Sequence, residues 1–180
     1  VTACTGLDAL AHAVETWATT RRSELSAMFS REAYRLITTN LTQVLDQPLD
    51  LSARSAMQLG AALAGVAIEN SMLGAAHSAA NPLTAHFGIV HGHAVGMMLP
   101  HVVRYNSSAG DFYADLDLNL PTRLTQLLAA TQLPIRLSDC GVPLSAIPML
   151  AEEAARQWTA QFNPRPVTVA DFVKLYEYCL

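Results

Sequence analysis

Two pairs of residues have the side-chain types of metal ligands. Asp8 and His12 are four residues apart, so on a helix their side chains lie one turn apart on the same face. His77 lies in an Ala-rich helical stretch and His91 opens the next predicted helix, and the segment His77–His93 holds four of the six histidines. Three imidazoles and one carboxylate suit Fe(II) or Zn(II) better than Mg²⁺ or Ca²⁺, which prefer oxygen ligands. The sequence therefore predicts one divalent metal site formed by Asp8, His12, His77 and His91.

Such a site would be catalytic rather than structural, because a single carboxylate leaves the bound ion with positive charge. An ion with an open coordination position can polarise a carbonyl or lower the pKa of an alcohol. Two plainer interpretations stay open. Asp8 can instead cap a helix start beside which His12 packs, and the histidines can be hydrogen-bonded core residues in a domain without metal.

Helices must position these residues, because apolar side chains recur at helical spacing and no stretch keeps the two-residue alternation of a strand. A capping box of Thr5 and Asp8 predicts the first helix start, and Thr168 with Asp171 predicts the last. The stretch after Asp50 is apolar on nearly every side, which predicts a central helix. The predicted helices cover about 6–20, 25–46, 50–70, a segment ending near 80, 91–104, 111–117, one starting at 121, 146–158 and 168–178. The fold class is all-α.

Composition indicates one soluble domain over residues 1–180, with 51% hydrophobic residues. A net charge of −4 leaves no basic stripe for nucleic acid. The apolar stretch Leu59–Leu83 contains Glu69, Asn70, His77 and Asn81, which favours a buried helix over a membrane span. The three cysteines are far apart and odd in number, which excludes a disulfide framework and indicates a cytoplasmic protein.

Three regularly spaced glycines lie in the histidine-rich segment. Gly88, Gly92 and Gly96 recur every four residues, and we expect them to permit close backbone approach near the site.

No nucleophile elbow, paired cysteine and histidine, or paired catalytic carboxylates can be recognised. The chain begins at Val1 without a methionine and enters a helical pattern at once, so we expect a piece of a longer protein.

Two long motifs resemble the iron-containing alcohol dehydrogenases. The first is TGLDALAHAVE, residues 5–15, and the second is AHSAANPLTAHFGIVHGHAVGMMLPHVVRYN, residues 76–106. The tail NPRPVT, residues 163–168, is also similar to the C-terminal end of the family. The resemblance covers almost the whole chain, but only the helical C-terminal half of the family.

This resemblance implies a helical domain of the kind that this family shares with the dehydroquinate synthase-like fold, and it places the family's metal ligands on Asp8, His12, His77 and His91. The complete enzyme would use Fe(II) or Zn(II) with NAD(P) to oxidise a small alcohol to an aldehyde or ketone, or the reverse. The family's N-terminal α/β domain, whose glycine-rich turn holds the coenzyme, is absent from this chain and would be its partner, and a homo-oligomer is a further expectation.

The resemblance also assigns three further positions. Ile68 and Leu73 would line the substrate pocket, although a core role fits both equally well. Asn81 would contact the coenzyme where the family often has a histidine, and asparagine cannot shuttle a proton near neutral pH. The maleylacetate reductase branch has a differently patterned second motif and ranks lower. The alternative function is a free-standing truncated module that binds metal or a partner subunit without catalysis.

Overall fold

Eight α-helices and three short 3₁₀ segments follow one another, without a strand, in a computed structural model that describes all 180 residues. The predicted all-α class is confirmed. The helices are α1 (Thr2–Ala18), α2 (Glu24–Asp46), α3 (Leu51–Glu69), α4 (Ala75–Phe87), α5 (His91–Ser107), α6 (Leu120–Ala130), α7 (Ile147–Arg156) and α8 (Val169–Cys179). The 3₁₀ segments are Ser138–Cys140, Leu144–Ala146 and Trp158–Phe162.

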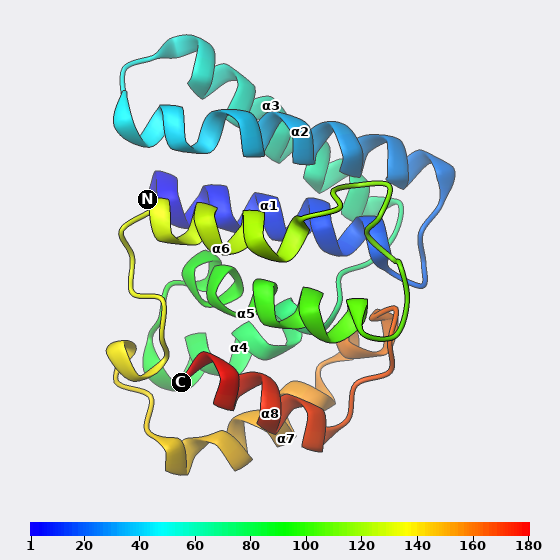
Figure 1. The fold of residues 1–180 in the computed structure, drawn as a ribbon, viewed down its shortest axis with the longest axis vertical. Helices are drawn as coiled ribbons and strands as arrows, with labels where there is room; N and C mark the ends of the chain where they lie inside the picture. The colour runs from blue at the N-terminus through cyan, green and yellow to red at the C-terminus, as the bar shows by residue number, and fades with distance from the viewer.

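Helix α1 lies at the centre of the packing. It contacts α2 and α3 on one side and α5 on the other, while α4, α7 and α8 form the far end of the molecule (Figure 1). Apolar residues such as Leu10, Val14 and Trp17 leave almost no α1 surface exposed. They belong to a single core cluster of 43 buried residues. A helix buried on most of its circumference is held rigidly, so the polar side chains that it carries are placed accurately.

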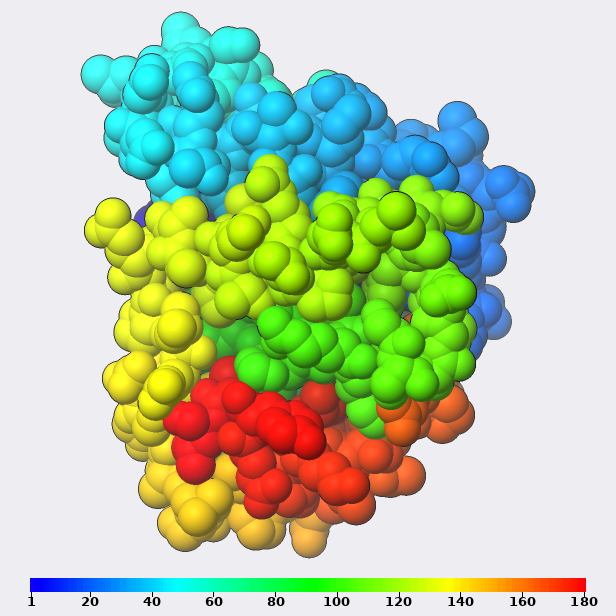
Figure 2. Space-filling view, in the orientation of Figure 1, coloured from blue at the N-terminus to red at the C-terminus, as the bar shows by residue number.

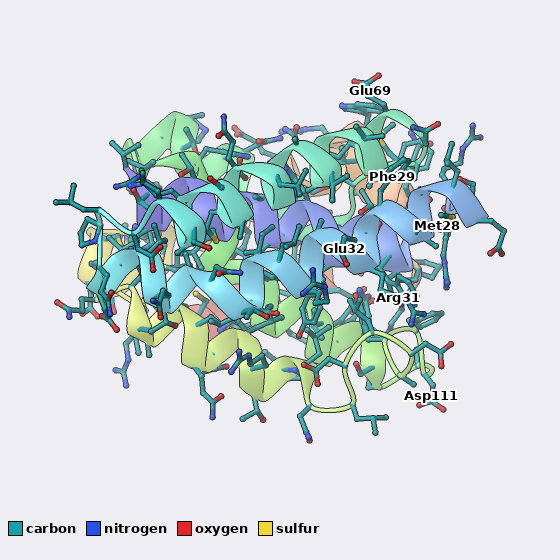
Figure 3. All side chains as sticks on the ribbon, turned by 90° about the horizontal axis from the view of Figure 1, so that it is seen from above. Met28, Phe29, Arg31, Glu32, Glu69 and Asp111 are labelled. Atoms are coloured by element: carbon teal, nitrogen blue, oxygen red, sulfur yellow. The ribbon has the colours of Figure 1, made fainter.

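Helix α3 is not the central helix that its composition predicted. Of its nineteen residues only Ala53, Gly60, Ala64 and Ala67 are buried. Helices α2 and α3 form the upper edge of the molecule in Figure 1, and seen from above they run side by side nearest the viewer, with Met28 and Glu69 at the same end (Figure 3). The small residues let α3 lie close to α2: a Cβ built on Gly60 would stand 2.8 Å from Cγ1 of Ile37. The expectation was wrong because the small residues of α3 serve to bring one face of the helix close to α2. The remaining residues of the helix are not buried.

Helix α3 is also long and apolar enough to cross a membrane when judged by length and composition alone. A single helix of this kind is weak evidence for a membrane span.

Three predicted boundaries are corrected. Helix α1 begins at Thr2 with Val1 before it, so Thr5 and Asp8 lie inside the helix and form no capping box. Helix α4 begins at Ala75, after a break that separates it from α3, and continues through Pro82 to Phe87 instead of ending near residue 80, because Pro82 and Leu83 are buried in the core. Local rules for helix ends are outweighed here by tertiary packing.

The segment 111–117 contains turns rather than the predicted short helix. Two side chains anchor it to the helical body: the Tyr113 hydroxyl accepts a hydrogen bond from Asn106, and Asp117 accepts one of 2.6 Å from the Tyr34 hydroxyl. These anchors hold the backbone in a non-helical path. The capping box of Thr168 and Asp171 is present as predicted.

Candidate metal centre

Three helices bring the four predicted ligands to one place. Asp8 and His12 lie on successive turns of α1, His77 lies in the first turn of α4, and His91 is the first residue of α5. The shared point is Asp8 Oδ1. It lies 3.8 Å from Nε2 of His12, 3.5 Å from Nε2 of His77 and 3.7 Å from Nε2 of His91. Segments about eighty residues apart in sequence therefore converge on one carboxylate oxygen.

Ligand atoms of Asp8, His12 and His77 all lie within 4.8 Å of one another, which is close enough to share an ion. The imidazoles of His12 and His77 are stacked with ring centroids 4.8 Å apart, and His91 is tilted against His77 at 5.4 Å. His77 is buried, whereas the side chain of His91 is 37% exposed. The cluster is therefore closed on the His77 side and opens to the surface beside His91.

The cluster contains two polar atoms that no protein group satisfies. Asp8 Oδ1 and His77 Nε2 are buried and have no hydrogen-bond partner. Each such atom costs about 1–3 kcal/mol when it is left unpaired in the interior. A divalent cation between these atoms would satisfy both, and one carboxylate with neutral imidazoles is a donor set that Fe(II) and Zn(II) accept. The residues present fit a metal ion.

Glu15 contacts His77 at the ring nitrogen that does not face Asp8, and the sequence analysis did not identify this residue. Its Oε2 lies 2.5 Å from His77 Nδ1, and its Oε1 accepts a hydrogen bond of 2.6 Å from the Ala76 backbone N–H. The carboxylate thus sits at the N-terminus of α4, where free N–H groups favour an anion. Because Nδ1 faces a carboxylate, it carries the proton and Nε2 is left facing Asp8. One signal was available: Glu15 is the only charged residue of α1 besides Asp8, and it lies seven residues, or two turns, further on.

The charges of the cluster set its protonation. Burial lowers the pKa of His12 to about 4, with the neighbouring His77 acting in the same direction. Burial also lowers the pKa of His91. For His77 burial has the same effect, but Glu15 and Asp8 outweigh it and raise its pKa to about 9. Without a metal ion, His77 is therefore protonated on both ring nitrogens at neutral pH, and a bound ion would displace the proton on Nε2 while the proton on Nδ1 stays beside Glu15. His12 is neutral and keeps a free lone pair.

The electrostatics of Asp8 agree with this description. Burial raises the pKa of its carboxyl, but the close approach of His77 and the charges of His12 and His91 outweigh burial, so the pKa lies below its usual value and Asp8 is ionised at neutral pH. An ionised Asp8 has the charge that the predicted single anionic ligand requires, and its binding of a metal ion stays a prediction.

Close approach of α1 and α5 depends on two glycines of α5. A Cβ built on Gly92 would stand 2.1 Å from the Cys4 carbonyl oxygen and 2.9 Å from Cβ of Asp8. A Cβ built on Gly96 would likewise stand 2.8 Å from Cδ1 of Leu7. Gly88 has a different role from the expected one: it has no neighbour within 4 Å and ends α4 in the left-handed conformation at φ 64°. Glycine suits that position because other residues are strained there.

The remaining three histidines lie away from the cluster, and two of them have polar partners there. His86 Nε2 lies 2.8 Å from Glu153, and His93 Nε2 donates to the Pro134 carbonyl at 2.6 Å. His101 lies further along α5. The six histidines thus divide into three that meet at Asp8 and three that do not.

The other predicted positions lie on the elements around the cluster. Asn81 is one turn after His77 on α4, and its Nδ2 donates to Gln157 at 3.0 Å. Ile68 is in the last turn of α3, and Leu73 lies in the connection to α4. All three are half-buried, and none lines a cavity of this chain. Their contacts with substrate or coenzyme stay a prediction.

Comparison with known proteins gives consistent matches. Residues 2–180 match the family model described as "Fe-containing alcohol dehydrogenase family, C-terminal". The chain is 35% identical to 1,3-propanediol dehydrogenase of Klebsiella pneumoniae over 92% of its length and 47% of that protein. It is 32% identical to lactaldehyde reductase of Escherichia coli (strain K12), covering 97% of the chain and 50% of the relative.

Among solved structures, 1,3-propanediol oxidoreductase superposes with a TM-score of 0.90 at 31% identity, over 99% of this chain and 51% of that one. The chain spans about half the length of the curated relatives that it matches.

Proposed function

The chain belongs to the iron-containing alcohol dehydrogenase family, and from that premise we propose that it is the metal-binding half of an NAD(P)-linked enzyme that interconverts a small alcohol and its aldehyde or ketone. The observation that supports this proposal most directly is the pair of buried unpartnered atoms, Asp8 Oδ1 and His77 Nε2, at the meeting point of three histidines. The relatives named above act on alcohols or aldehydes according to their names, and their length supports a second half that would bring the coenzyme.

In this proposal Asp8, His12, His77 and His91 hold an Fe(II) or Zn(II) ion. When bound, the ion supplies Lewis-acid polarisation of the substrate oxygen. Glu15 keeps the proton of His77 on Nδ1, so that Nε2 stays available. The partly exposed side chain of His91 marks the side from which substrate would approach.

The other proposed contacts surround this opening. Ile68 and Leu73 would contact the substrate, and Asn81 would contact the coenzyme with its amide but could not take up a proton there. An α/β half would cover the cluster and exclude water. A cytoplasmic location agrees with the three free cysteines.

Metal content tests the site. Purified without oxygen, the chain should contain close to one Fe or Zn per molecule by elemental analysis, and His77→Ala or His91→Ala should remove it. His86→Ala is the matched control, because His86 pairs with Glu153 outside the cluster. Unchanged metal in both cluster variants would contradict the assignment.

Activity tests the reaction. The chain alone should show no alcohol-dependent reduction of NAD(P)⁺, and adding the matching α/β half of a relative should produce it. Full metal occupancy without activity in the presence of that half would favour the alternative, a metal-binding module that does not catalyse.

A further inference from the structure

A second polar site lies at the other end of α5, away from the metal cluster. A cavity of about 490 Å³ opens between the last turns of α5, the tail before α8 and α8 itself. In Figure 2 this junction is on the visible face, where the green α5 segment meets the red α8. His101, which lines it, is ten residues beyond His91, or roughly 15 Å along the helix axis. The cavity is within the usual size of small-molecule sites.

The lining is basic, although the chain as a whole is acidic. Arg104, Arg165 and Lys174 contribute three cations and Asp171 contributes one carboxylate, in a chain whose net charge is −4. None of the three cations lies within 4.0 Å of a carboxylate, so none forms a direct ion pair, although the charge of Asp171 acts on Arg165 at longer range. Asp171 is already engaged as a helix cap, where it accepts hydrogen bonds from Thr168.

Arg165 is held in position before any ligand arrives. Its Nη1 donates to the Tyr105 carbonyl at 2.8 Å and to Ser108 Oγ at 2.7 Å, and its guanidinium stacks 3.7 Å from the Tyr105 ring centroid. Its Nε and Nη2 have no protein partner. An arginine whose plane is fixed while donors stay free can bind an oxyanion without losing much conformational entropy.

A structural role accounts for part of this arrangement. Arg104 lies in the last turn of α5, where positive charge is favourable, and Arg165 satisfies one carbonyl there. That role does not involve Lys174, an exposed side chain on α8 that has no hydrogen bond or ion pair and faces the same cavity. It also leaves the cavity unexplained, with Leu175 and Tyr178 as an apolar wall.

We propose that this cavity binds a small molecule with a phosphate group, whose oxygens contact Arg104, Arg165 and Lys174 while its carbon portion lies against Leu175 and Tyr178. Three cations from three segments suit a tetrahedral dianion better than a planar carboxylate, which two donors of one arginine can satisfy. His101 is neutral here, because burial and then Arg104 lower its pKa to about 4, so its imidazole adds a hydrogen-bonding group without a further charge.

Titration calorimetry on the chain after removal of metal by a chelator tests the proposal with inorganic phosphate and pyrophosphate. Both should bind, and Arg104→Ala or Lys174→Ala should each weaken binding on the order of tenfold, the value of one charged hydrogen bond. Arg156→Ala is the matched control, since it removes an exposed arginine from α7 and should leave binding unchanged. Thermal melting of each variant should show that the fold is retained.

Four results would overturn the proposal. The first is no binding of either anion, and the second is equal weakening by Arg156→Ala, which would indicate general attraction. Malonate binding as tightly as pyrophosphate would assign the site to dicarboxylates instead. An acidic peptide that binds through Arg104 and Lys174 and is not displaced by pyrophosphate would assign it to a macromolecule. His77→Ala, which removes the proposed metal site, should bind both anions as tightly as the wild-type chain, and this separates the cavity from the proposed catalytic function.

Discussion

At the residue scale, Glu15 shows how one carboxylate can organise a candidate metal site without being a ligand. One of its oxygens holds the backbone at the start of α4, and the other holds the ring of His77. The same side chain therefore positions the helix and selects the tautomer. Supporting groups of this kind commonly determine metal affinity as strongly as some ligands do.

Glu15→Gln should weaken metal binding by roughly 10- to 100-fold. The carboxylate accepts one hydrogen bond on each oxygen, from Ala76 and from His77, whereas an amide has a single acceptor oxygen and no negative charge. Competition with a chelator of known affinity measures the change. Glu153→Gln is the control, since Glu153 pairs with His86 outside the cluster. Equal effects of both substitutions, or no effect of Glu15→Gln, would show that Glu15 does not act through His77.

Asp8→Asn distinguishes a ligand from a helix cap. Asp8 lies inside α1 and caps nothing, so the free energy of unfolding of the chelated protein should fall by less than the free energy of metal binding does. Metal binding should fall by about tenfold or more, because the only anionic ligand is lost. Chemical denaturation and metal titration measure the two effects separately.

Thr168→Ala provides the opposite pattern for comparison. It removes the observed capping box of α8 and should cost ~1 kcal/mol while metal binding is retained. A cap-sized loss of stability for Asp8→Asn with metal retained would contradict the ligand role.

At the element scale, the distance between α1 and α5 decides whether Asp8 and His91 can meet. Gly92 follows His91 directly, and the Cys4 carbonyl occupies the space that a Cβ would need. The glycine is therefore required by the neighbouring helix and not by its own backbone conformation.

Gly92→Ala should lower the free energy of unfolding by about 1–3 kcal/mol, the usual cost of overpacking, and should weaken metal binding as well. Gly65→Ala is a matched control in α3, where nothing lies within 4 Å of the added methyl group. It should raise stability by about 0.5–1 kcal/mol, because alanine is the better helix former. Denaturant unfolding with metal analysis measures both, and unchanged metal affinity in Gly92→Ala would contradict the close-approach argument.

At the scale of the whole molecule, the proposed metal would link α1, α4 and α5, which are the helices around the core. A ligand that binds only the folded state adds about 2.7 kcal/mol when its concentration is 100 times its Kd. For a chain of this length that corresponds to a rise in Tm of roughly 5–11 °C. Removing the metal with a chelator should lower the Tm by this amount in a differential scanning experiment.

His77→Ala is the control for this shift, because the variant has no complete site and its Tm should not respond to chelator. Equal melting of the wild-type chain with and without metal would show that the ion, if bound, does not stabilise the fold.

The sequence by itself determined the features that depend on local chemistry. Helical periodicity predicted the all-α class, the Thr168 and Asp171 pair predicted a real cap, and the two motifs that resemble the family selected the residues that meet at Asp8. These signals lie within one or two turns of chain or within one motif, where neighbouring residues interact directly.

Only the tertiary structure decided what covers each helix. An apolar pattern does not say which element lies against it, so α3 was expected at the centre and lies at the edge, and a helix end was expected before Pro82, where α4 continues. Glu15 reaches His77 across 62 positions of sequence, and the two unpartnered atoms exist only where three helices meet. Such features arise from burial and from contacts between distant segments, and burial is a property of the folded chain.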